Sequence, residues 1–325
     1  MTPPDGADVH QNGVGLRTAI GSVVLPNPVM PASGTAGYGT ELGAYVDLST
    51  LGAFVTKSLA HFAWDGNPPL RTHATRGGMI NSVGLQGPGI AAWKREQLPA
   101  LAEAGARVVV SIWGRSIDDY RLAADLLADC GDEVIAVEVN LSCPNTEAGG
   151  ALIAHDPGAS ATAIAATEAC GRPRWAKLSP NTDRVAEVAA AARAAGAEAV
   201  TLANTVLGMA IDPVTGAYRI GSQERGGGLS GPAIHPIAVR IVHDVHRALP
   251  DLPIIGVGGI ASGADALEMI RAGASAVQVG TANFDDPRST TRVLDELRDL
   301  VGRVGADSIG ELVGAVGGAQ PNRAS

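Results

Sequence analysis

Short apolar runs recur along the chain, each bounded by turn residues, and this repetition constrains the fold more than any other feature. Eight runs have the length and residue types of buried strands. They cover residues 29–32, 53–56, 107–112, 134–139, 174–178, 199–202, 253–257 and 274–279. Alanine-rich segments with helical spacing separate them, at 91–104, 116–130, 158–169, 182–195, 235–249, 263–272 and 287–301. Glycines 105, 196 and 273 suit left-handed caps at the ends of three of these helices.

This alternation favours a parallel (β/α)8 TIM barrel over an open doubly wound sheet. The length of 325 residues alone would also allow two ordinary domains. We assign 1–22 to an N-terminal tail and lead-in, 23–312 to one barrel domain, and 313–325 to a flexible C-terminal tail. Long loops are expected after strands two, four and six. Two of them, 58–90 and 203–234, are glycine-rich and helix-poor, and loops of that length are usually functional.

Charge and cysteine content narrow the class of partner. A formal net charge of −9 gives no electrostatic reason to expect nucleic acid or an anionic membrane as a partner. No apolar run approaches the roughly 20 residues of a membrane span, and the N-terminus lacks a signal-like pattern. We therefore expect a cytoplasmic protein with a small-molecule ligand. Three widely spaced cysteines predict neither a disulfide framework nor a metal or iron–sulfur site, so any cluster must belong to another chain.

Polar residues follow the predicted strands, where barrel enzymes build their active sites. Turn residues alone would carry little weight, but Lys57 and Lys177 end otherwise apolar runs and must face the site or pair with an anion. The last two strands run into the glycine-rich strings GVGGI (256–260) and VGTA (279–282), which predict a phosphate-bearing ligand. The glycine spacing does not fit a Rossmann dinucleotide site.

The string NLSCPN (140–145) places one thiol between two carboxamides. A lone cysteine is usually a small buried hydrophobe. Cys143, however, lies in a strand-end loop and precedes a proline, which suits a nucleophile or a proton acceptor. Because no activating histidine is near in sequence, proton abstraction fits better than acyl transfer. Two other interpretations stay open: a Schiff-base lyase or aldolase with Lys177 as nucleophile, and a non-catalytic flavin-binding or scaffold barrel.

Ten strings follow one another along the chain: NPVMPASGT (27–35), VTKS (55–58), GNPPLR (66–71), GGMINSVGLQGPG (77–89), NLSCPN (140–145), AKLSPN (176–181), LANTVLGMAID (202–212), GGLSGPAI (227–234), GVGGI (256–260) and VGTANF (279–284). In this order they resemble class 1 dihydroorotate dehydrogenase, and GNPP with GLQ resembles its B subclass. The likeness spans residues 23–286. The resemblance implies an FMN-containing barrel that oxidises dihydroorotate to orotate in pyrimidine (UMP) synthesis.

Site roles follow from the resemblance, position by position. It makes Cys143 the general base while hydride passes to FMN. It implies orotate contacts from Lys57, Asn81, Ser82, Val83, Gly84, Leu85, Asn140, Asn145, Asn204 and Thr205. It implies FMN contacts from Ser33, Gly34, Lys57, Ser58, Ser111, Asn140, Lys177, Ala203, Gly231, Gly258, Gly259, Gly280 and Thr281.

The resemblance also implies partners. The B subclass works with a second subunit that carries FAD and an iron–sulfur cluster and passes electrons to NAD. A fumarate-linked enzyme and a paralogue that oxidises another dihydropyrimidine are the alternatives, and a homodimer core is expected. Three stretches depart from the family pattern: SIWG (111–114), HFAWD (61–65) and GSQERG (221–226).

Overall fold

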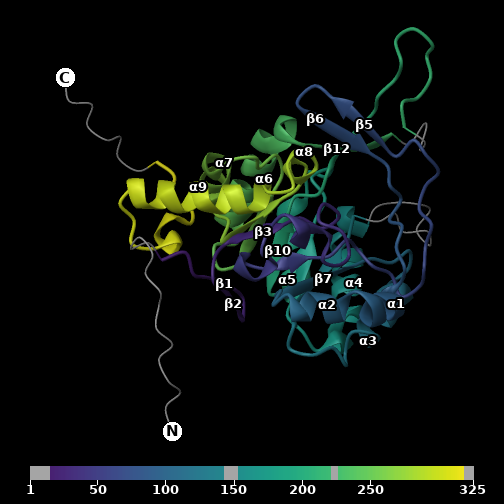
Figure 1. Cartoon of the computed structure of the whole chain (residues 1–325), viewed down its shortest axis with the longest axis horizontal. Helices are drawn as coiled ribbons and strands as arrows, with labels where there is room; N and C mark the ends of the chain where they lie inside the picture. Colours follow the sequence, from purple (N-terminus) through teal and green to yellow (C-terminus); the bar gives the residue numbers. More distant parts are fainter. Residues whose placement is uncertain (1–14, 143–152, 221–225, 318–325) are drawn as a thin grey trace.

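Eight parallel strands form a barrel at the centre of the computed structural model, which describes residues 15–142, 153–220 and 226–317 (Figure 1). Each strand falls on one of the predicted apolar runs, so the predicted (β/α)8 barrel is confirmed. Around the sheet the order is β3-β14-β13-β10-β9-β8-β7-β4. The strands are β3 (Val29–Pro31), β4 (Phe54–Val55), β7 (Val108–Ile112), β8 (Val134–Asn140), β9 (Arg174–Lys177), β10 (Ala199–Leu202), β13 (Ile254–Val257) and β14 (Ala276–Val279).

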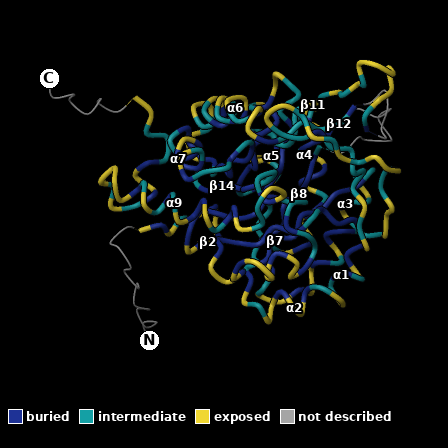
Figure 2. The backbone as a smooth tube through the Cα atoms, turned by 45° about the horizontal axis from the view of Figure 1, so that its top comes forward, coloured by how far each residue is buried: buried dark blue, intermediate teal, exposed yellow. Residues whose placement is uncertain are grey.

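The barrel nearly closes between its first two strands, where the backbone N–H of Gly52 donates to Val29 O at 2.8 Å. Helices cover the outside, so the strands are buried on both faces and appear dark in Figure 2. Burial on both faces explains why the strands read in the sequence as continuous apolar runs rather than as alternating ones.

The helices also follow the prediction, with identifiable start and stop signals. Ser116 and Ser262 form capping boxes with Asp119 and Asp265. The three cap glycines have φ of 66°, 98° and 126°. The helices are α1 (Ile90–Glu96), α2 (Leu98–Glu103), α3 (Ile117–Asp125), α4 (Pro157–Ala166), α5 (Val185–Ala194), α6 (His235–Ala248), α7 (Gly263–Ala272), α8 (Ala282–Asp285) and α9 (Ser289–Arg303).

One predicted helix is divided in two. The segment 91–104 forms α1 and α2, which meet at Gln97. Pro99 causes the break, because it has no N–H to donate and its ring would clash with a carbonyl of the preceding turn. The connection from β3 to β4 contains no α-helix in its described residues; it has the 3-10 turns η1 (Glu41–Ala44) and η2 (Leu48–Thr50) instead.

An antiparallel hairpin, β1 (Thr18–Ile20) and β2 (Val23–Leu25), covers the floor of the barrel. Ile20, Val23 and Leu25 pack in one buried cluster with Trp175 and other inward residues of the barrel strands. The hairpin spans the boundary that we expected at residues 22 and 23, so both of its strands lie with the barrel.

The two long glycine-rich segments are not plain loops. Their strands form a second, antiparallel sheet in the order β11-β12-β6-β5, at one edge of the barrel (Figure 1). Its strands are β5 (Thr72–Thr75), β6 (Gly78–Asn81), β11 (Val206–Gly208) and β12 (Gly227–Ser230). Leu229 is paired with Ile80, so segments far apart in sequence form one layer. The predicted long loop after strand four falls mostly outside the described residues.

Near the C-terminus a 3-10 turn, η7 (Ile309–Leu312), packs against the core. Residues 313–317, which belong to the predicted tail, contact α7: the Gly314 N–H donates to Ile270 O at 3.0 Å. Within 15–142, 153–220 and 226–317, no helix has the length and apolar character needed to cross a bilayer.

The hairpin generates a stability prediction. Ile20→Ala should lower the free energy of unfolding by about 2–5 kcal/mol, because Ile20 is fully buried and its removal leaves a cavity at the barrel floor. Val24→Ala on the same hairpin is the control, since Val24 is 50% exposed and should change stability by less than about 0.5 kcal/mol. Urea denaturation measures both; equal losses would show that the hairpin does not seal the floor.

Candidate active site at the carboxyl ends of the barrel strands

Side chains inside the barrel form layers, because alternate residues of each strand point to the same face. The inward side chains in the lower part of the strands are apolar and form one buried cluster, with one residue from each strand. It consists of Met30, Val55, Val109, Ala136, Trp175, Ala199, Ile255 and Ala276. Two residues further along several strands the inward positions are polar, and this second layer lies directly beneath the strand ends.

The second layer contains a buried ion pair. Lys177 Nζ lies 3.6 Å from Glu138 Oε1 and donates to Gln278 Oε1 at 3.4 Å. The other carboxylate oxygen, Glu138 Oε2, accepts from Gln278 Nε2 at 2.7 Å and from Thr201 Oγ1 at 3.0 Å. All four side chains are buried. Sequence reasoning found Lys177 but missed Glu138, Thr201 and Gln278, which are hidden within apolar runs.

Above this layer, predicted site residues from different strands join in one hydrogen-bonded chain. The Ser58 hydroxyl is the centre, with Ser33 Oγ at 3.2 Å and Ser111 Oγ at 2.9 Å. Asn140 Nδ2 donates to Ser58 Oγ at 3.3 Å, and Asn204 Nδ2 donates to Asn140 Oδ1 at 3.3 Å. Five residues that sequence analysis placed at separate strand ends are thus neighbours in space.

Asn140 and Asn204 are oriented by further bonds. The buried Tyr120 hydroxyl donates to Asn140 O at 2.7 Å, and the Ser142 N–H donates to Asn140 Oδ1 at 3.2 Å. The Thr205 N–H donates to Asn204 Oδ1 at 2.8 Å. Asn181, the last residue of AKLSPN, donates through Nδ2 to Thr205 O at 3.0 Å. Asn181 belongs to a motif that we quoted but was not named as a site residue.

Lys57 lies beside Gly34 at the ends of β4 and β3. A Cβ built on Gly34 would lie 3.1 Å from Lys57 Cδ and 3.4 Å from its Nζ, so glycine leaves room for the lysine side chain. Gly34 has φ of 85°, a conformation that also favours glycine. The structure therefore brings together two further predicted residues.

The predicted segment Asn81, Ser82, Val83, Gly84 and Leu85 begins on β6 and follows the edge of the second sheet. Asn81 Nδ2 donates to Gly228 O at 3.1 Å, and a Cβ on Gly228 would lie 2.1 Å from Thr205 Oγ1. Asn81 and Thr205 therefore flank the same strand. The rest of the segment is bound to the GNPP loop, where Asn67 Nδ2 donates to Ser82 Oγ at 2.8 Å.

Glycines line a cavity of about 500 Å³ at the ends of β13 and β14, which we call the glycine cradle. Gly259 has φ of 69°, and a Cβ on it would lie 2.7 Å from His235 Cβ and 2.9 Å from Gly231 O. Gly258 O lies 2.9 Å from His235 Nδ1. The cavity wall includes Gly77, Gly78, Gly231, Pro232, Gly259, Ile260, Ala261, Thr281, Ala282, Phe284, Asp285, Ser289 and Arg292. Arg292 supplies a positive charge that sequence analysis missed.

The remaining predicted cofactor positions lie close to this cavity. Thr281 donates through its hydroxyl to Ser230 Oγ at 2.8 Å. A Cβ on Gly280 would meet only Ala32 Cβ at 3.6 Å and Thr35 Cγ2 at 3.9 Å, so the main chain of Gly280 is accessible from one side. Ala203 is buried directly after β10.

Two of the stretches that depart from the family pattern pack against each other. Phe62 and Trp113 meet edge to face with ring centroids 5.8 Å apart, and the Arg115 guanidinium lies 4.6 Å from the Phe62 ring centroid. His61 Nε2 lies 3.0 Å from Asp119 Oδ1. Burial would raise the pKa of Asp119. Hydrogen bonds from the backbone N–H groups of Arg115 and Ser116 and from the His61 side chain outweigh this effect, so the pKa lies below its ordinary value.

Cys143 and Asn145 lie outside the described residues, as do positions 221–225. The other two thiols, Cys130 and Cys170, are free and buried, and burial raises the pKa of both. Raised pKa values keep these thiols protonated and unreactive, so they serve as small core side chains.

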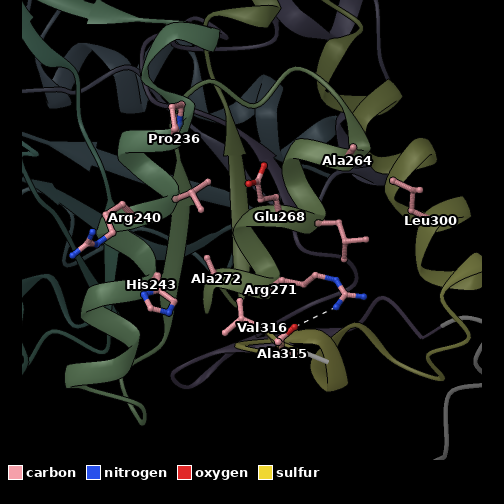
Figure 3. Close-up of a pocket in the computed structure, with 13 residues that line it drawn as sticks. Pro236, Arg240, His243, Ala264, Glu268, Arg271, Ala272, Leu300, Ala315 and Val316 are labelled. Carbon is pink, nitrogen blue, oxygen red and sulfur yellow. Dashed lines mark hydrogen bonds between the residues drawn. The ribbon is translucent and has the colours of Figure 1, made fainter. Parts of the chain in front are cut away.

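A second cavity, of about 770 Å³, lies among the outer helices (Figure 3). It is lined by α6, α7 and residues 315–317, and Arg271 Nη1 donates to Ala315 O at 3.2 Å. None of the predicted site residues that the structure describes lines it. One of its residues, Glu268, lies 3.1 Å from His235 Nε2. Because His235 Nδ1 also lies 2.9 Å from Gly258 O, this histidine connects the second cavity to the glycine cradle.

These features define a barrel enzyme whose strand ends offer carboxamides, hydroxyls and a buried lysine beside a glycine-lined cavity. The sequence model of the family described as "Dihydroorotate dehydrogenase" matches residues 15–301. The chain belongs to the dihydroorotate dehydrogenase family, whose members are flavin-dependent oxidoreductases that act on dihydroorotate.

Named relatives cover almost the whole chain. A protein of Alkaliphilus oremlandii named dihydroorotate dehydrogenase B (NAD(+)), catalytic subunit, is 44% identical over 91% of this chain and 96% of its own. A protein of the same name from Geobacter sulfurreducens is 44% identical over 93% and 98%. A provisionally named dihydroorotate dehydrogenase A (fumarate) of Solibacter usitatus is 45% identical over 93% and 98%.

The glycine cradle generates the second prediction. Gly259→Ala should destabilise the protein more than Gly171→Ala. Both glycines have positive φ, 69° and 62°, but a Cβ meets nothing within 4 Å at Gly171. Gly171→Ala therefore adds only backbone strain of about 1–2 kcal/mol, whereas Gly259→Ala adds clashes with His235 and Gly231. Urea denaturation compares the free energies of unfolding, and equal losses would contradict a tightly packed cradle.

Proposed function

We propose that this chain binds FMN across the carboxyl ends of the barrel strands and oxidises dihydroorotate to orotate in de novo pyrimidine synthesis. Cys143 is the general base that takes a proton from the dihydropyrimidine ring. Bound FMN would supply the hydride acceptor. The observation that carries this proposal is the hydrogen-bonded chain from Ser33 through Ser58 and Asn140 to Asn204, in which Asn140 is paired in register with Lys177.

The chemistry of the described residues fits FMN. The glycine-lined cavity offers close backbone approach, the Thr281 hydroxyl and the Arg292 guanidinium, which together suit a phosphate. Lys177 lies at the level of Asn140, with which it is paired in the parallel register of β8 and β9. A buried cation at that level suits the pyrimidine end of a flavin, which gains negative charge on reduction.

The same residues suit a planar, carboxylated pyrimidine. Asn140, Asn204 and Asn81 are carboxamides, which can donate to and accept from the ring amides. Lys57 is the cation placed to bind the substrate carboxylate, and Asn145 adds a further amide on the same loop as Cys143. Ser82, Val83, Gly84, Leu85 and Thr205 complete the substrate contacts.

The proton acceptor follows from the same arrangement. Cys143 comes three positions after Asn140, whose side chain is oriented by Ser58 and Ser142. A thiol so near in sequence to a proposed substrate amide can remove a ring proton as the hydride leaves. Cys130 and Cys170 cannot replace it, since both are buried in the helical layer.

We propose that electrons pass to NAD through a separate FAD and iron–sulfur subunit. Supporting this, two of the relatives described above are named as NAD(+)-linked catalytic subunits. The alternative, a fumarate-linked enzyme, is supported by the name of the Solibacter relative. A homodimer core would bury Leu207, Met209 and Ile211, large apolar side chains that are each about half exposed near the second sheet.

The decisive experiment is anaerobic reduction of the purified, FMN-loaded chain by dihydroorotate, followed by addition of fumarate or of NAD. Rapid bleaching of the flavin absorbance is expected. Reoxidation by fumarate alone would identify the fumarate-linked alternative. Cys143→Ser should keep FMN bound but slow flavin reduction by about 100-fold or more, because serine is a far weaker base. Unchanged stopped-flow reduction in this variant would exclude Cys143 as the proton acceptor.

A further prediction isolates the phosphate. Arg292→Ala should weaken FMN binding about tenfold or more while leaving riboflavin binding unchanged, because riboflavin lacks the phosphate that Arg292 would pair with. Arg298→Ala, on an exposed turn of the same helix, is the matched control. Fluorescence titration of the flavin-free protein measures both ligands. A similar loss of riboflavin affinity would contradict the proposal that the FMN phosphate binds in this cavity.

A further inference from the structure

We propose that Glu138 is a positioning residue: its carboxylate, held by Thr201 and Gln278, holds the Lys177 ammonium at the barrel axis, where it meets the flavin. This inference rests on the proposed function, since it concerns how the chain presents Lys177 to FMN. It adds three residues, Glu138, Thr201 and Gln278, that neither the sequence motifs nor the comparisons assign to the site.

The two carboxylate oxygens of Glu138 have different partners. Oε2 takes both hydrogen bonds, from Gln278 at 2.7 Å and from Thr201 at 3.0 Å. Oε1 is buried and has no hydrogen-bond partner among the described residues, and it lies 3.6 Å from Lys177 Nζ. One oxygen therefore fixes the carboxylate, while the other is left to attract the ammonium.

Gln278 reaches Glu138 from the opposite side of the barrel. Its strand, β14, is four strands away from β8 in an eight-stranded barrel, so Glu138 and Gln278 reach each other across the barrel interior. Gln278 donates to Glu138 through Nε2 and accepts from Lys177 through Oε1. One amide thus ties the acid to the lysine from the opposite wall. Gln278 is fully buried, which leaves its side chain little freedom to move.

The burial of these two charges has a cost in free energy. A buried ion pair seldom stabilises a fold relative to apolar side chains of similar volume, because both charges lose their hydration. The inward residues two positions earlier on the same strands belong to a wholly apolar cluster, which shows that this barrel can fill its interior without charges. A charged layer immediately beneath the strand ends therefore has a functional explanation. Lys177 has three N–H donors, and the hydrogen bond to Gln278 uses one, so donors remain for a ligand above it.

A double-mutant cycle tests the inference. The variants are Glu138→Gln, Lys177→Met and the double variant, and the measurements are the FMN affinity of the flavin-free protein and the midpoint potential of the bound flavin. Each single variant should weaken FMN binding by roughly tenfold or more and shift the midpoint potential in the same direction. The reason is that Lys177→Met removes the ammonium and Glu138→Gln releases it from its position. The double variant should match Lys177→Met alone, because Glu138 acts through the lysine.

Two results would overturn the inference. One is a double variant whose loss of affinity is the product of the two single losses; the other is a shift of potential in Glu138→Gln opposite in sign to that of Lys177→Met. Glu187→Gln is the matched control, because Glu187 is exposed and pairs with Arg184 at the surface, and it should leave both measurements unchanged.

If Glu138→Gln does not fold, Gln278→Met replaces it in the same cycle, because it keeps the two charges and removes only the tie between them. Its effect should also vanish in the Lys177→Met background, and persistence there would overturn the inference. Failure of the wild-type chain to bind FMN would instead overturn the proposed function. Normal FMN binding with additive losses would reject the role of Glu138 alone.

Discussion

The interior of the barrel depends on one geometric constraint: successive residues of a strand point to opposite faces, so only every second residue of a strand faces the interior. The lowest level is filled by apolar side chains, together with the hairpin of β1 and β2. The next contains Glu138, Lys177, Thr201 and Gln278, and the uppermost exposes amides, hydroxyls and glycine backbone. A shift of one strand by a single residue would point its inward side chains outward, toward the surrounding helices.

The second sheet shows why the long connections of this barrel must be long. Residues after β4 and after β10 reach the same edge and pair there, so that Asn81 and Thr205 flank Gly228. The approach is close: a Cβ on Gly78 would lie 1.9 Å from Ser230 O. Glycine is therefore required where the two segments cross, and the crossing forms one wall of the cavity at the ends of β13 and β14. The second sheet therefore supports both Asn81 and the wall of this cavity.

The departures from the family pattern have a physical explanation in their contacts. Phe62 lies in the stretch before GNPP that departs from the pattern, and Trp113 lies two residues after Ser111. In the fold these two rings meet, and Arg115 lies over Phe62 and over Trp64. The two departures are therefore in direct contact, with the ring of one loop packed edge to face against the ring of the other. Ser111 keeps its place in the hydroxyl chain through Ser58.

Local patterns in the sequence determined the strands, the helices and their caps, because apolar periodicity, capping serines and left-handed glycines act within a few residues. They also determined which residues end the strands, and hence Ser58, Asn140, Lys177 and the cradle glycines. Only the tertiary structure decided which strands oppose each other across the barrel. Glu138 lies in the apolar run AVEVN, where nothing local distinguishes an acid that faces Lys177 from one that faces solvent. Its partner Gln278 is 140 residues away, and only closure of the barrel brings the two together.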